Sequence, residues 1–178
     1  PGILKHGAKS FSSIGNVKSA GTKLVCLDSL FKNPGVYEMD MGTPMKKIIY
    51  DIGGGFIKPV KALQVGGPLG GVIPIKEVEK LNLDFQEFTK AGFMLGHGSI
   101  VSIPEDFNMI KYIHHLFKFS AEESCGKCFP GRLGSYRGKE MFDQAINKTN
   151  KIPIKLLNEL LVTMKKGSLC ALCGAIPS

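Results

Sequence analysis

The chain has 178 residues, 43% of them hydrophobic, and carries 23 basic against 15 acidic side chains, for a formal net charge of +8. This composition is typical of globular proteins and excludes a disordered chain, and the length allows one ordinary domain or two small ones. The lysines stand singly or in pairs, so we expect no nucleic acid and a basic surface that either docks an acidic partner subunit or only keeps the protein soluble. No apolar run approaches the ~20 residues that cross a bilayer, and no signal-peptide core is present. We therefore expect no direct membrane insertion and a reducing, cytoplasmic location.

The first hundred or so residues combine β-rich runs with glycine-rich turns. Strands are expected at residues 23–27 and 35–39, with Cys26 as a small buried side chain in the first of them. Thr43 and Pro44 then indicate the start of a helix with Met45, Ile48 and Ile49 on its apolar face, and further strands are expected at 60–65 and 98–103. This order predicts an α+β unit in which one helix packs across a small mixed sheet. The glycine runs lack the residues of a phosphate loop and are better explained as tight turns.

The rest of the chain shows helical periodicity. A helix is expected to start at Ser102, which is followed by acidic residues, and to run to about Phe119. Further helices are expected from the region of residue 132 to 147 and from Pro153 to Gly167. Three helices around two cysteine-bearing turns predict a small bundle whose open end holds an inorganic centre.

Four of the five cysteines form two Cys-x2-Cys pairs, Cys125 with Cys128 and Cys170 with Cys173. Two thiolates three positions apart on a turn can bind one metal ion or cluster, so the pattern predicts a metal centre. Spacing alone leaves zinc and an iron–sulfur cluster open. A closed zinc site would make the chain a non-redox interaction module whose folding depends on the metal.

The sequence around these cysteines resembles a known family. The segments that carry the resemblance are Glu122-Glu123-Ser124-Cys125-Gly126-Lys127-Cys128, with Pro130, Arg132 and Gly134 after it, and Gly167-Ser168-Leu169-Cys170-Ala171-Leu172. They resemble the NADH-binding flavoprotein subunit of complex I, of NAD-reducing hydrogenases and of NAD-dependent formate dehydrogenases (beta subunit). The segments 132–138 and 167–171 are most similar to the formate dehydrogenase branch.

The resemblance implies three parts. Residues 1–21 would be the tail of a missing domain that binds FMN and NAD, residues 22–103 a ubiquitin-like, soluble-ligand-binding β-grasp domain, and residues 104–178 a helical domain that binds a 4Fe-4S cluster. The chain would relay single electrons between FMN and downstream iron–sulfur clusters as part of an NADH-linked oxidoreductase, without being catalytic alone. Its partners would be other subunits of the complex, including a 2Fe-2S ferredoxin-like subunit.

The resemblance also assigns residues of the cluster site. The family holds its cluster with Cys-x2-Cys-x2-Cys and one remote cysteine, which Cys125, Cys128 and Cys170 match. Around them we expect Gly126 to let backbone N–H groups approach the cluster sulfurs, Lys127 to add positive charge and Pro130 to shape the return of the loop.

The chain departs from the family at the third ligand, because position 131 is glycine and has no side chain to bind a metal. Cys173 stands where relatives usually carry glycine. Three explanations are open: Cys173 replaces the missing ligand, the site holds three ligands or an incomplete cluster, or Gly131 is a substituted residue. The candidate ligands are therefore Cys125, Cys128, Cys170 and Cys173.

Overall fold

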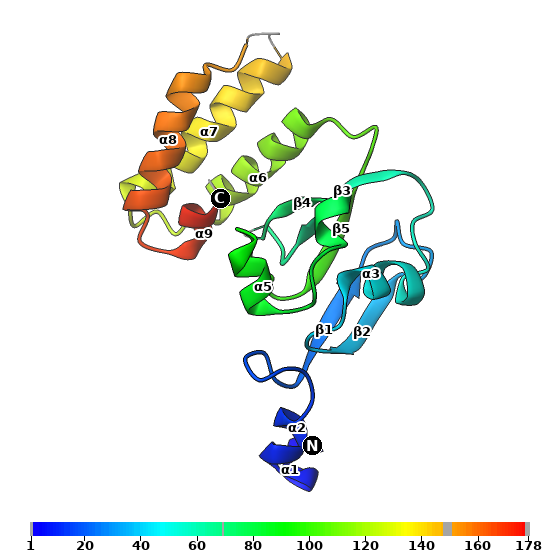
Figure 1. Ribbon diagram of the computed structural model, residues 1–178. Coiled ribbons are helices and arrows are strands. Elements are labelled where there is room, and N and C mark those ends of the chain that lie inside the picture. Colours follow the sequence, from blue (N-terminus) through cyan, green and yellow to red (C-terminus); the bar gives the residue numbers. More distant parts are fainter. Residues whose placement is uncertain (1, 69, 148–150, 177–178) are drawn as a thin grey trace. The chain divides into compact units, whose positions relative to one another are not determined.

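The computed structural model of the chain describes residues 2–68, 70–147 and 151–176. Tertiary contacts divide the chain into two units, residues 1–105 and residues 106–178. All described strands belong to the first unit, whereas the second is built from helices, which confirms the predicted α+β class (Figure 1). Among the described residues, no helix has both the length and the apolar character needed to cross a bilayer. The assignment of 1–21, 22–103 and 104–178 to three named domains stays a prediction.

A mixed five-stranded sheet organises the first unit. Its strands are β1 (Thr22–Leu27), β2 (Gly35–Asp40), β3 (Val60–Val65), β4 (Val72–Pro74) and β5 (Ser99–Pro104), in the order β2-β1-β5-β3-β4. Strands β1 and β5 run parallel, with Cys26 opposite Ser99, and the other pairs are antiparallel. Sequence patterns predicted every strand except β4, which at three residues is too short to show an alternation of apolar and polar side chains.

The helices of the first unit are short. They are α1 (Gly2–His6), α2 (Ala8–Ser12), α3 (Met45–Lys47), which continues into the π-helical turn η1 (Ile48–Ile52), α4 (Ile75–Val78) and α5 (Phe85–Lys90). The side chains predicted to face the core, Met45, Ile48 and Ile49, are fully buried. They join a core whose other members include Val25, Leu27, Phe31, Leu63, Val65, Ile73, Leu83, Phe88 and Ile100.

The predicted burial of Cys26 is wrong. Val25 and Leu27 on β1 are 0% and 3% exposed and face the core, whereas Cys26 between them is exposed. Successive side chains of a strand point to opposite faces of the sheet, so a residue between two core positions faces away from that core.

The second unit contains α6 (Met109–Glu123), α7 (Phe129–Asn147), α8 (Ile154–Gly167) and α9 (Ala171–Ala175). The predicted helix start at Ser102 is wrong, because Ser102 lies in β5, where its backbone N–H and hydroxyl donate to Asp28 over 2.6 and 3.0 Å. Helix α6 instead begins after Asn108, whose side-chain oxygen accepts hydrogen bonds from the N–H groups of Ile110 and Lys111. Helix α9 was not predicted.

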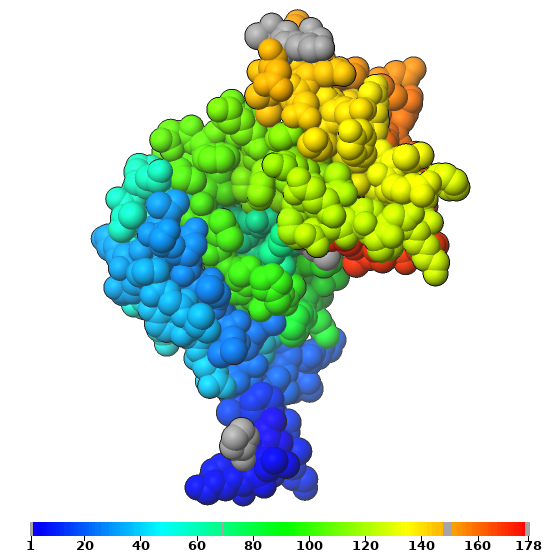
Figure 2. Space-filling view, turned by 180° about the vertical axis from the view of Figure 1, so that it is seen from behind, coloured from blue at the N-terminus to red at the C-terminus, as the bar shows by residue number. Residues whose placement is uncertain are grey.

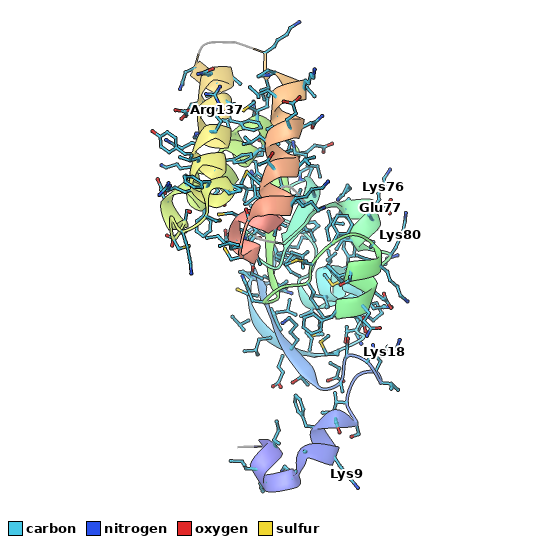
Figure 3. The ribbon with its side chains drawn as sticks, turned by 90° about the vertical axis from the view of Figure 1, so that its left-hand side faces the viewer. Lys9, Lys18, Lys76, Glu77, Lys80 and Arg137 are labelled. Carbon is cyan, nitrogen blue, oxygen red and sulfur yellow. The ribbon has the colours of Figure 1, made fainter. Side chains whose placement is uncertain are left out.

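A stripe of small residues on α7 lets its neighbours approach closely. Gly131, Gly134, Ser135 and Gly138 are all buried on this helix. A Cβ at Gly134 would lie 2.7 Å from Met164 of α8, and one at Gly138 would lie 2.2 Å from the ring of Phe117 of α6. Figure 3 shows α7 (yellow) and α8 (orange) running side by side with their side chains interleaved. This packing brings the first turn of α7 and the segment after α8 to the same end of the unit.

Candidate metal centre

The two cysteine segments are held by helix ends. Cys125 and Cys128 lie in the loop between α6 and α7, and the Cys128 carbonyl accepts the hydrogen bond of the Arg132 N–H over 2.9 Å at the start of α7. Cys170 precedes the first residue of α9 and its carbonyl accepts from the Gly174 N–H over 3.2 Å, while Cys173 lies within α9. Helices α7 and α9 are in contact, and the C-terminal segment (red) adjoins the α6–α7 segment (yellow-green to yellow) in Figure 2.

The four predicted cysteines converge on one region of the helical unit. An ideal Cβ built at Gly131 would lie 2.9 Å from the Cys128 Sγ and 3.2 Å from the Cys173 Sγ, so both sulfurs border the same small space. Burial raises the pKa of the Cys173 thiol; a hydrogen bond with the Ser124 side chain opposes this rise, and the charges of Cys170, Cys128 and Cys125 add to it. Cys173 is thus electrostatically coupled to all three other candidate ligands.

Backbone hydrogen bonds favour the thiolate form of Cys128. Hydrogen bonds from the backbone N–H groups of Leu169 and Gly131 lower its pKa and outweigh the opposing effect of burial. A thiolate is the form that binds metal, and the amino end of a long helix such as α7 also favours it. Since Leu169 belongs to the second cysteine segment, its N–H group also ties that segment to the first.

Three further residues were predicted to shape the site. Gly126 has φ +74°, in the left-handed region that favours glycine, and its N–H donates to the Ser124 Oγ over 3.3 Å. Lys127 is exposed. The ring of Pro130 packs against the end of α8, where a Cβ at Gly167 would lie only 2.9 Å from the Pro130 Cγ. The N–H groups that reach a cysteine sulfur are those of Leu169 and Gly131, which sequence reasoning did not find.

Two serines near the thiols were also missed as contributors to the site. The Ser124 hydroxyl contacts Cys173, and the Ser168 Oγ, two residues before Cys170, is buried with no hydrogen-bond partner among the described residues. A buried hydroxyl without a partner is costly unless a bound group satisfies it. Nothing in the sequence pattern distinguishes either hydroxyl from a surface serine.

The donor atoms at this end of the unit suit an iron–sulfur cluster. Four thiols, one of them with a lowered pKa, and a buried hydroxyl donor suit an anionic cluster whose sulfurs accept hydrogen bonds. The residues present fit an iron–sulfur cluster.

The chain is similar to several known proteins. Residues 111–178 match the family model described as the NADH-ubiquinone oxidoreductase-F iron-sulfur binding region. Over its whole length the chain is 34% identical to the NADP-reducing hydrogenase subunit HndC of Solidesulfovibrio fructosivorans, covering 37% of that protein. Over 98% of its length it is 31% identical to the mitochondrial NADH dehydrogenase [ubiquinone] flavoprotein 1 of Dictyostelium discoideum, again covering 37% of that protein.

A solved structure supports the same relationship. The crystal structure of an NAD+-reducing [NiFe]-hydrogenase in the H2-reduced state matches 98% of this chain with a TM-score of 0.84 at 25% identity, and the match covers 30% of the hydrogenase chain. The chain therefore spans about a third of the length of the relatives it matches. These matches do not specifically show the formate dehydrogenase branch, which stays a prediction.

Proposed function

We propose that this chain relays single electrons through a 4Fe-4S cluster within an NADH-linked flavoprotein oxidoreductase, because residues 111–178 match the family model of the NADH-ubiquinone oxidoreductase-F iron-sulfur binding region. The observation that carries the proposal is the convergence of the two Cys-x2-Cys segments at one end of the helical unit that this family model covers. When bound, such a cluster supplies one-electron transfer.

The residues of the chain would hold and tune this group. Cys125, Cys128 and Cys170 would bind the cluster as the resemblance implies, and the Leu169 and Gly131 N–H groups would stabilise negative charge on the Cys128 sulfur. Hydrogen bonds to sulfur and exclusion of water are two of the means by which a protein sets a cluster's potential. Gly126 would shape the loop through its left-handed turn and Pro130 through its contact with Gly167, while the exposed Lys127 would add positive charge.

We also propose FMN and NAD sites outside these 178 residues, on an N-terminal part, because the match covers only 37% of the relatives whose names mention NADH or NADP. We also propose a 2Fe-2S ferredoxin-like subunit as a partner, and a cytoplasmic location, since free thiols used for metal binding suit a reducing compartment.

The test is anaerobic reconstitution of the 178-residue chain with ferrous iron and sulfide, and separately with zinc. We expect about four iron and four acid-labile sulfide atoms per chain, a broad visible absorption band and a paramagnetic signal after reduction. Cys125→Ala should lose most of the iron, whereas Cys26→Ser, on the exposed face of β1, should bind as the wild type does. Uptake of one zinc per chain with no iron or sulfide would contradict the proposal and favour the zinc-stabilised module.

A further inference from the structure

The glycine at position 131 and the cysteine at position 173 occupy complementary space. Gly131 is buried on the first turn of α7, and its missing side chain would start 3.2 Å from the Cys173 Sγ and 3.3 Å from the Cys173 Cβ. These distances are shorter than ordinary van der Waals contact. A side chain at 131 would therefore require the Cys173 and Cys128 side chains to shift. The sulfur of Cys173 thus fills the space that a side chain at 131 would enter.

Cys173 also reaches the neighbours that a ligand at 131 would have. The same Cβ at 131 would lie 2.9 Å from the Cys128 Sγ, so Cys173 and Cys128 face one another across this space. Cys173 lies within α9, three residues after Cys170, which directly precedes the helix. The two cysteines of this segment are therefore separated by less than one helical turn.

A purely structural role is the alternative. Cys173 is 2% exposed and packs with Phe117, Phe142 and Met164, as a small apolar side chain would. That role does not explain why the sulfurs of Cys173 and Cys128 border the same small space beside Gly131. Burial does not prevent ligation, since a thiol that bonds to a metal gives up its proton to solvent as the bond forms.

We infer that Cys173 is the fourth thiolate ligand of the cluster, in place of a cysteine at position 131, so that the site is held by two pairs, Cys125 with Cys128 and Cys170 with Cys173. The inference rests on the proposed function. It replaces the three-plus-one ligand arrangement of the family with a two-plus-two arrangement on the same pair of helix ends. It also makes the fourth ligand the most buried of the four.

The experiment compares the full chain with Cys173→Ala, Gly131→Cys/Cys173→Ala and the control Cys26→Ala after anaerobic reconstitution. The readouts are iron per chain, Mössbauer spectra, which distinguish an iron that lacks a sulfur ligand, and paramagnetic spectra of the reduced protein. We expect Cys173→Ala to retain at most about three irons per chain, the double variant to regain about four, and Cys26→Ala to match the wild type. Far-UV circular dichroism of each chain without metal reports whether the fold is retained.

Each outcome has a defined meaning. If Cys173→Ala binds as much iron as the wild type with unchanged spectra, Cys173 only packs the core and the inference is overturned, while the proposed function stands. If Cys173→Ala loses its helical signal as well as iron, the double variant decides: recovery of iron by the thiol at 131 supports the inference, and failure to recover it overturns it. A wild-type chain that takes up no iron and sulfide overturns the proposed function, and the inference falls with it.

Discussion

Substitution of Gly138 by alanine probes the close packing that positions the cluster site. The added Cβ would lie 2.2 Å from two ring atoms of Phe117, so the ring must retreat by about 1.2 Å to reach the 3.4 Å of ordinary contact. Phe117 is 2% exposed and stacks on Phe142 with 5.6 Å between ring centroids, which leaves the ring little room to move. Overpacking of this kind costs about 1–3 kcal/mol, whereas replacing a helical glycine by alanine gains about 0.5–1 kcal/mol.

The net expectation is a loss of about 1–2 kcal/mol in the free energy of unfolding of the helical unit. For a unit of this size the melting temperature should fall by about 5–15 °C. Urea and thermal denaturation followed by far-UV circular dichroism would measure both quantities. Gly174→Ala is the matched control, because its Cβ would meet only the Ser168 Cβ at an ordinary 3.6 Å. A Gly138→Ala variant as stable as the wild type, or as stable as Gly174→Ala, would refute the close contact between α6 and α7.

Two further predictions concern helix starts. Asn108→Ala removes the cap that accepts hydrogen bonds from Ile110 and Lys111, and should lower the free energy of unfolding of the helical unit by about 1 kcal/mol; an unchanged urea midpoint would contradict this. Burial alone would raise the pKa of Asp84, but hydrogen bonds from Asn16 and from backbone N–H groups outweigh it and hold the pKa below 3.8. The folded-state pKa is lowered, so the stabilisation is present above pH 3.8 and is lost as the pH falls through the folded value. In Asp84→Asn, the free energy of unfolding of the first unit should therefore fall less as the pH is lowered below about 4 than it does in the wild type. The same fall in both proteins, measured by denaturation at several pH values, would contradict this prediction.

A ligand at 173 in place of one at 131 would illustrate how a cluster site can tolerate a change in the position of one ligand. A 4Fe-4S cluster is usually held by four cysteine thiolates. One of these can come from either of two backbone segments if both lie beside the same iron. Here α7 and α9 are in contact, so under the inferred ligand set a sulfur at 131 or at 173 would bind the same iron. Loss of a thiol on one helix would then be compensated on the other without a change of fold.

Local patterns determined much of this protein. The spacing of Met45, Ile48 and Ile49 predicted a buried helical face, and β1, β2, β3 and β5 were found from runs of β-prone residues and flanking glycines. The two Cys-x2-Cys pairs predicted a metal centre, and the resemblance named a family whose model matches residues 111–178. Such features can be predicted from the sequence because side chains return to the same face every 2 residues on a strand and every 3.6 on a helix, and because metal-binding cysteines often occur in close pairs.

Other features depended on contacts between segments distant in sequence. The exposure of Cys26 depends on which face of the sheet the core covers, and the start of α6 depends on Asp28 holding Ser102 in β5. The resemblance predicts a ligand at position 131, where this chain has glycine, but the sequence does not show that positions 131 and 173 adjoin. Only the packing of α7 against α8 and α9 brings them so close that a Cβ at 131 would lie 3.2 Å from the Cys173 Sγ, because a stripe of glycines allows that approach and no local periodicity encodes the distance between two helices.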